Sequence, residues 1–274
     1  MPDLPTGIVP TGIVLADSVT KPTETWPGAV LIAGSHGGVY AAYCAAKAGV
    51  RAMILNDAGR GKDEAGIAGA AYCQALALPY AAVDTLSAKI GNGEDMAARG
   101  VISVANDAAA ALGVTAGMAA VEAAELVTRA EQVDAGVPVY EEARAELDAG
   151  SSGRRIILLD SASLIGPGDE GHVLITGSHG GILGTDTKAA LKADGYAAFF
   201  NDAGGGADDA GYGRLAALDD RGIVAGCVAA MSARIGDGRS TYEDGVLSRV
   251  NLAAVAKGGA AGMALKEFAA MLID

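Results

Sequence analysis

Short apolar runs alternate with longer, Ala-rich stretches along the whole chain. In the first half, the runs at 13–16, 29–33, 52–55 and 81–85 are largely apolar and bounded by Gly, Asn or Asp. Such runs predict strands that are buried on both faces of a sheet. The stretches at 39–49, 64–77, 94–113 and 116–127 are predicted to be helices. The second half repeats this order, and the alternation favours an α/β fold with mainly parallel strands.

The two halves also carry the same polar strings in the same order. The string GSHGG occurs at Gly34–Gly38 and again at Gly177–Gly181, offset by 143 residues. The strings NDAG and SA[KR]IG recur with an offset of 145 residues, beginning at Asn56, Asn201, Ser87 and Ser232. This repetition predicts two tandem copies of one β-α-β unit, related by a pseudo-twofold axis.

Composition divides the chain into three segments. The first α/β repeat is predicted over 1–128 and the second over 154–274. Residues 129–153 between them are polar, contain a proline and close on Gly-Ser-Ser-Gly, which is typical of a surface connector. Its most charged part, residues 139–148, is predicted to be a helix.

Charge and residue usage exclude several classes of partner. A net charge of −13 and an aromatic content of 4% argue against nucleic-acid binding, which needs clustered Lys and Arg and stacking rings. No apolar run reaches the roughly 20 residues of a membrane span. Three cysteines without metal spacing do not form a disulfide framework. We expect a cytoplasmic protein with a small-molecule substrate, and a homo-oligomer is compatible with the sequence.

Each repeated polar string follows a predicted strand. In open parallel sheets, ligands bind at the carboxyl ends of the strands, so four loops of each copy should converge on one edge. At this position, GSHGG is expected to form a turn that binds an anion or a carbonyl group through its backbone N–H groups. The alternative is a tight turn with a capping serine. The glycines expected to approach the ligand are Gly37, Gly38, Gly180 and Gly181.

Three sharper interpretations of GSHGG lack part of their pattern. A dinucleotide loop needs G-x-G-x-x-G, which the string does not supply. A nucleophile elbow needs a later histidine, and the first copy has none after His36. A zinc site would need both copies to face each other, without any H-x-x-H spacing in support. No metal and no cofactor are therefore predicted.

The remaining strings supply acid/base and anchoring groups. Asp57 is expected to orient an imidazole or share its proton, although an Asx-turn explains it equally well. Lys89 and Arg234 are expected to anchor a substrate anion. A Ser–Lys dyad could exist only in the first copy, because Arg cannot act as a base.

These observations favour an enzyme that acts on a small anionic or carbonyl-bearing metabolite. Hydrolysis of an amide or ester comes first, because a serine stands next to the anion-binding turn. A two-base isomerase, racemase or lyase is the second class, and a non-catalytic ligand-binding or scaffold protein is the third. The candidate catalytic residues are His36, His179, Asp57, Asp202, Ser35 and Ser178. The candidate substrate-binding residues, besides the four glycines, are Asn56, Asn201, Ser87, Lys89, Ser232 and Arg234.

Overall fold

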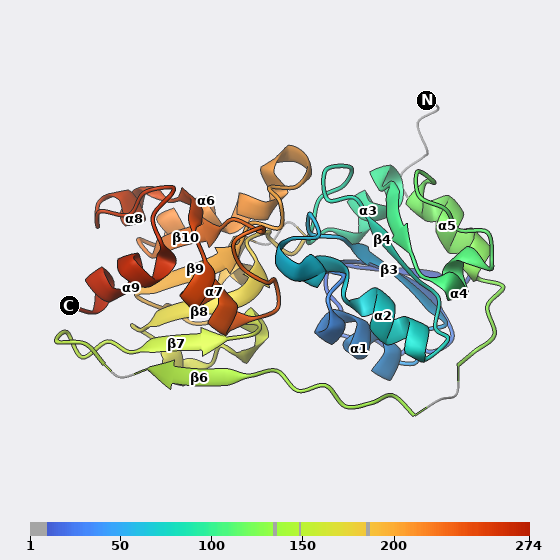
Figure 1. Ribbon diagram of the computed structural model, residues 1–274, viewed down its shortest axis with the longest axis horizontal. Coiled ribbons are helices and arrows are strands. Elements are labelled where there is room, and N and C mark those ends of the chain that lie inside the picture. Colours follow the sequence, from blue (N-terminus) through green and yellow to red (C-terminus); the bar gives the residue numbers. More distant parts are fainter. Residues whose placement is uncertain (1–9, 134–135, 148, 185–186) are drawn as a thin grey trace.

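The computed structural model describes residues 10–133, 136–147, 149–184 and 187–274, which form two α/β lobes side by side (Figure 1). In the first lobe a five-stranded sheet has the order β1-β2-β3-β4-β5. Strands β1 to β4 are parallel and β5 is antiparallel to β4. The strands are β1 (Ile13–Ala16), β2 (Val30–His36), β3 (Ala52–Asn56), β4 (Tyr80–Val83) and β5 (Ile102–Ala105).

The second lobe contains a six-stranded sheet with the order β11-β10-β9-β8-β7-β6. Strands β7 to β10 are parallel, whereas the two edge strands β6 and β11 are antiparallel to their neighbours. The mainly parallel α/β fold that the sequence predicts is thus confirmed. The strands are β6 (Arg144–Leu147), β7 (Ile156–Leu159), β8 (Val173–His179), β9 (Ala197–Asn201), β10 (Val224–Val228) and β11 (Leu247–Val250).

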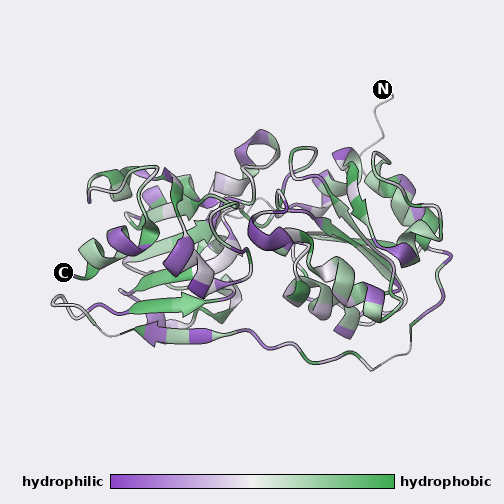
Figure 2. Ribbon diagram, viewed as in Figure 1, coloured by the Kyte–Doolittle hydropathy of each residue, from purple (hydrophilic) through white to green (hydrophobic). Residues whose placement is uncertain are grey.

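Helices cover both faces of each sheet. In the first lobe α1 and α2 pack on the face that carries Leu31 and Met53, while α3 and α5 pack on the face that carries Val30 and Ile32. The strands are therefore buried on both sides, which explains why they are apolar throughout (Figure 2). These helices are α1 (Val39–Lys47), α2 (Gly69–Ala75), α3 (Gly93–Arg99), α4 (Asp107–Ala110) and α5 (Ala120–Val127).

The second lobe has the same three layers with one difference. A helical segment after β8, equivalent to α1, is not formed: residues 182–196 contain only a 3₁₀ turn, η4 (Thr187–Ala190), and residues 185–186 lie outside the described part. The cover on this face comes from η4 and α6, and α9 covers the other face. The helices are α6 (Gly213–Asp219), α7 (Gly238–Asp244), α8 (Leu252–Val255) and α9 (Leu265–Ile273).

Two helix predictions are wrong. The stretch 94–113 is not one helix, because Gly100 ends α3 and β5 then pairs with β4. Asn106 opens α4 by accepting the N–H of Ala109. In the connector, residues 139–143 form no regular structure and Arg144–Leu147 form β6 instead of a helix; residue 148 is not described. Charged and apolar residues alternate along β6, as expected of an edge strand with one face exposed.

The connector runs along one side of the molecule from the first lobe to β6 (Figure 1). Its contacts include the hydroxyl of Tyr72, which donates to the carbonyl of Pro138 at 2.9 Å. No helix in the described residues is long and apolar enough to cross a membrane.

Candidate functional site

The strand-end loops of each lobe converge, as the sequence predicts. In the first lobe the N–H of Val19 donates to Oγ of Ser35 at 3.0 Å, which joins the loop after β1 to the end of β2. In the second lobe the N–H of Ala162 makes the same bond to Ser178 at 2.9 Å. Both serines thus hold neighbouring loops together.

The carboxyl-end edges of the two sheets face each other. The N–H of Ala207 donates to the carbonyl of Thr85 at 2.8 Å, and the N–H of Lys62 donates to the carbonyl of Ala230 at 2.8 Å. Between these loops, Ala58 and Ile90 of the first lobe form a small apolar cluster with Ala203 and Ile235 of the second. The short polar segment that contains Lys62 lies at the centre of this boundary (Figure 2).

A cavity of about 280 Å³ lies between the lobes and is lined by both. At roughly 30 Å³ for each water molecule, it has room for about nine waters or a small metabolite. Its wall includes the serine and the histidine of each GSHGG string and Glu142 of the connector. The polar side chains in this wall include Ser35, His36, Tyr40, Glu142, Ser178, His179 and Arg214. A second cavity of about 170 Å³ shares His36 and Tyr40 with the first.

The two imidazoles are held in one tautomer. Nδ1 of His36 accepts the N–H of Gly38 at 3.1 Å, and Nδ1 of His179 accepts the N–H of Gly181 at 3.1 Å. A ring nitrogen that accepts a backbone N–H carries no proton, so the proton of the neutral ring is on Nε2. Each imidazole therefore offers an Nε2–H donor to a ligand.

Burial keeps both rings neutral. Burial lowers the pKa of His36 to about 4. The pKa of His179 lies well below its usual value, first because of burial and then because of the positive charge of Arg214. Near neutral pH neither ring is a cation, so both act as neutral hydrogen-bond donors, a role suited to polarising a carbonyl oxygen.

Glu142 brings a carboxylate into the cavity from the connector. Burial raises its pKa, and the nearby negative charge of Asp160 adds to this rise. Its Oε1 is buried without a hydrogen-bond partner in the described residues, and Oε2 accepts a long bond from Ser163 Oγ at 3.5 Å. The hydroxyl of Tyr40 interacts with the same carboxylate and lowers its pKa. A carboxyl group with a raised pKa beside a cavity is typical of an acid/base group.

The backbone of GSHGG is already hydrogen-bonded within the lobe. The N–H of Gly37 donates to the carbonyl of Asn56 at 2.7 Å, while that of Gly38 donates to His36. Gly180 and Gly181 make the equivalent bonds to Asn201 and His179. The donors that GSHGG offers to a ligand are therefore side-chain groups, the imidazole Nε2–H groups and the serine hydroxyls, in place of the backbone groups that the sequence suggests.

Asp57 binds backbone and a hydroxyl, with no bond to an imidazole. Its Oδ1 accepts the N–H groups of Gly59 and Thr85, both at 2.9 Å, and its Oδ2 accepts the hydroxyl of Ser103 at 2.8 Å. The neighbouring Asn56 accepts the N–H of Ala58 in the same loop. This is the Asx-turn that the sequence offers as the alternative.

The second copy of this loop is held in the same way. Oδ1 of Asp202 accepts the N–H groups of Gly204 and Ala230, both at 2.9 Å, and Oδ2 accepts the hydroxyl of Tyr212 at 3.1 Å. Asn201 accepts the N–H of Ala203. Both aspartates thus fix the NDAG loops, and neither lines the cavity.

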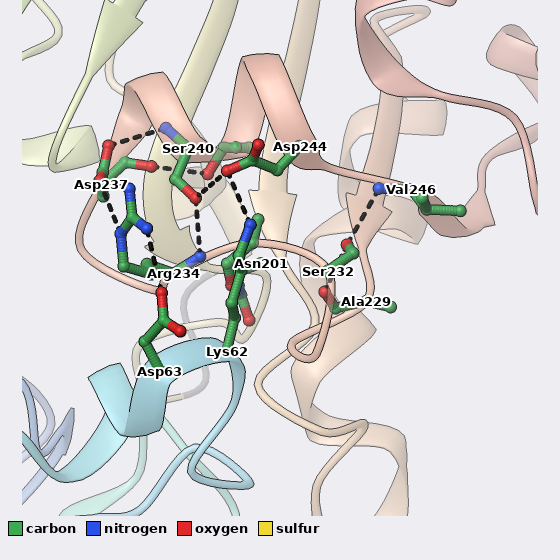
Figure 3. Close-up of polar contacts among 12 residues, drawn as sticks. Lys62, Asp63, Asn201, Ala229, Ser232, Arg234, Asp237, Ser240, Asp244 and Val246 are labelled. Atoms are coloured by element: carbon green, nitrogen blue, oxygen red, sulfur yellow. Dashed lines mark hydrogen bonds and ion pairs between the residues drawn. The ribbon is translucent and has the colours of Figure 1, made fainter.

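Lys89 and Arg234 join the lobes. Nη1 of Arg234 lies 3.1 Å from Oδ2 of Asp63 in the opposite lobe (Figure 3). Nζ of Lys89 lies 3.4 Å from Oδ2 of Asp208 in the other direction. Arg234 borders the smaller cavity, but neither cation lines the larger one.

The two serines of the SA[KR]IG strings stabilise turns. Ser232 Oγ donates to the carbonyl of Ala229 at 2.7 Å and accepts the N–H of Val246 at 2.9 Å (Figure 3). Ser87 makes the equivalent bonds to Asp84 and Val101. These contacts agree with a local structural role.

Arg214 is a buried cation that borders the cavity and that sequence reasoning missed. Its Nε donates to the carbonyl of Gly181 at 3.0 Å and its Nη1 to the carbonyl of Ala190. Burial lowers its pKa to about 10, so it remains charged near neutral pH. Lys21 and Lys192 also line the cavity.

Neither Glu142 nor Arg214 carries a sequence signal, because each belongs to a segment outside the repeated strings. Within the described residues, no group of three or more His, Cys, Asp or Glu side chains is placed to hold a metal ion. Comparison with protein-family models, curated proteins and solved structures gave no match.

Proposed function

We propose that the two lobes are copies of one unit related by a pseudo-twofold axis. The support is a set of paired contacts. Gly91 donates to the carbonyl of Gly34 at 2.8 Å, as Gly236 does to Gly177 at 2.7 Å. The side chains of Asp17 and Asp160 each accept a backbone N–H at 3.1 Å. Such a duplication brings two GSHGG strings, and so two histidines, to one cavity.

We infer that this cavity is the active site of an enzyme that moves a proton next to a carbonyl group in a small metabolite. This reaction belongs to the isomerase and lyase class. The observation that carries the proposal is the combination of Glu142, whose pKa is raised by burial, with two neutral imidazoles in the same wall.

The roles follow from the protonation states. Glu142 in its ionised form takes a proton from the carbon next to the carbonyl and returns it to the product. The Nε2–H groups of His36 and His179 donate to the oxygen, where negative charge develops. The pKa of a neutral imidazole lies closer to that of an enol than the pKa of an imidazolium does. Other enzymes also use a neutral histidine as the electrophile.

Hydrolysis of an amide or ester is the second candidate. It would use the same groups, with Glu142 activating a water molecule and the imidazoles holding the oxyanion. A serine nucleophile is less favoured, because Ser35 and Ser178 accept backbone N–H groups and neither forms a hydrogen bond with an imidazole of the described residues. The proposal also includes a cytoplasmic site of action, which rests on composition and charge alone.

The test is hydrogen exchange at carbon. Small oxo acids, with pyruvate as the first probe, are incubated with the protein in D₂O, and proton NMR follows the loss of C–H signal. We expect the wild type to accelerate exchange and Glu142→Gln to lower the rate by about 10²–10⁴-fold. Glu141→Gln, a change at the exposed neighbouring residue, is the matched control and should exchange as the wild type does.

Two results would decide against the proposal. Equal exchange rates for the wild type and Glu142→Gln would show that this carboxylate takes no part in the reaction. Release of an alcohol or amine from small esters and amides, without exchange at carbon, makes the protein a hydrolase.

A further inference from the structure

Arg214 occupies a position where the first lobe has no side chain. The N–H of Gly69 donates to the carbonyl of Gly37 at 2.9 Å, and the N–H of Arg214 makes the equivalent bond to Gly180 at 2.8 Å. A Cβ at Gly69 would lie only 2.6 Å from the carbonyl oxygen of Gly37 and 2.8 Å from the Cβ of Ala42 in α1. Only glycine fits there, because α1 is packed against it.

In the described residues between β8 and β9 no α-helix takes the place of α1, and the side chain of Arg214 contacts this segment. The residue is 5% exposed, and its guanidinium lies 4.9 Å above the ring of Phe200. Two of its nitrogens donate to carbonyls of the segments that follow β8, and the side chain borders the cavity. The lobes therefore differ at this position of the cavity wall.

Among the described residues, the charge of Arg214 meets backbone carbonyls and no carboxylate. No carboxylate in the described residues forms an ion pair with it, although a buried cation is costly unless it is paired. Lys21, which also lines the cavity, has no ion-pair partner among these residues either. The wall thus carries three cations, Lys21, Lys192 and Arg214, beside the carboxylates of Glu142 and Asp160, and none of the described carboxylates pairs with Arg214.

We propose that Arg214 binds the carboxylate of the substrate and so selects small carboxylic acids over neutral carbonyl compounds. This inference rests on the proposed function and names its substrate class: an oxo acid or a related carbonyl-bearing carboxylate. A guanidinium is suited to this task because its planar N–H donors match a carboxylate.

Carboxylate binding at Arg214 also orients the substrate. Arg214 belongs to the second lobe and contacts the GSHGG string that contains His179. Glu142 interacts with Tyr40 of α1 in the first lobe. The cavity therefore has an anchoring side and a reacting side, and the carbonyl of a bound oxo acid would lie between the two imidazoles.

The experiment compares the binding of pyruvate and pyruvamide by calorimetry. The two probes have the same size and the same carbonyl group and differ in charge. We expect the wild type to bind pyruvate at least about tenfold more tightly, and Arg214→Met to remove this preference. Arg214→Gln keeps an N–H donor for the carbonyls but no charge, and should lose the preference as well. The control is Arg221→Met, because Arg221 donates to the carbonyl of Leu191 but does not line the cavity.

A merely structural role for Arg214 would lower thermal stability and leave the preference for pyruvate unchanged. That result, or equal binding of both probes by the wild type, would overturn the inference. If neither variant folds, NMR of the wild type tests the inference. Pyruvate must then shift the Nε–H resonance of Arg214, and pyruvamide must not. A preference for pyruvate without exchange at carbon would leave Arg214 as the anchor and reject the proposed reaction.

Discussion

Nδ1 of His36 accepts the backbone N–H of Gly38 at 3.1 Å, two residues further along the same string. This short contact sets the tautomer of the ring and gives the last glycine of GSHGG a chemical role. The N–H that might have bound a ligand instead directs the imidazole to present Nε2–H to the cavity. The equivalent bond from Gly181 to His179 does the same in the second lobe.

The neutral imidazoles predict that acid weakens the fold. The pKa of His36 falls from 6.5 in the unfolded chain to about 4 in the folded protein, so between these values the unfolded state binds more protons. The contribution of His36 to stability should therefore be lost as pH drops from 6.5 to 4, with a slope of up to about 1.4 kcal/mol per pH unit, and His179 should add to this slope in the same direction.

Urea unfolding at several pH values measures this slope. His36→Gln and His179→Gln should each flatten it. His172→Gln serves as the comparison, since His172 does not line the cavity. An identical slope in all four proteins would show that the two rings are charged in the folded state.

Tyr40→Phe should move the acid limb of the pH–rate profile for hydrogen exchange to higher pH. The hydroxyl of Tyr40 stabilises the ionised form of Glu142, so its removal raises the pKa of the carboxyl group, and a higher pH is needed to ionise the base. Tyr43→Phe is the matched control, because Tyr43 lies on the same helix but does not line the cavity. A pH–rate profile of each variant measures the limb, and a shift to lower pH would contradict the assignment of Glu142 as base.

Asp57→Ala should destabilise the protein by roughly 2–4 kcal/mol, because the N–H groups of Gly59 and Thr85 and the hydroxyl of Ser103 lose their acceptor. Asp63→Ala, which removes an exposed ion pair with Arg234, should cost less than about 1 kcal/mol. Thermal unfolding compares the two. Equal effects would mean that the NDAG loop does not depend on its aspartate.

Much of the fold follows from the sequence because the parallel strands are apolar throughout and end in Gly, Asn or Asp. The missed strands are different in kind. β5 is four residues long and lies between Ala-rich stretches, so its flanks favour a helical pattern over a short strand. β6 does show alternation in Arg144–Leu147, but the charges of the connector suggest a solvated helix.

The sequence predicts the sheet edge at which each candidate histidine lies, but not that the two edges meet. Strand-end loops meet at an edge in any parallel sheet, which places His36 and His179 each at the edge of its own lobe. Whether the two edges face each other depends on contacts between lobes, such as Thr85 with Ala207, that no local pattern encodes. Glu142 and Arg214 reach the cavity only through the paths of the connector and of the segment after β8.

The position of Glu142 in the connector has a consequence for the order of assembly. The cavity needs α1 from the first lobe, a carboxylate from the chain between the lobes, and Gly236 from the second lobe. Its wall is therefore incomplete until Gly236 has been synthesised, although the first lobe has its own sheet and core. A nascent or truncated chain that ends before this residue lacks part of the cavity in which we propose that the reaction occurs.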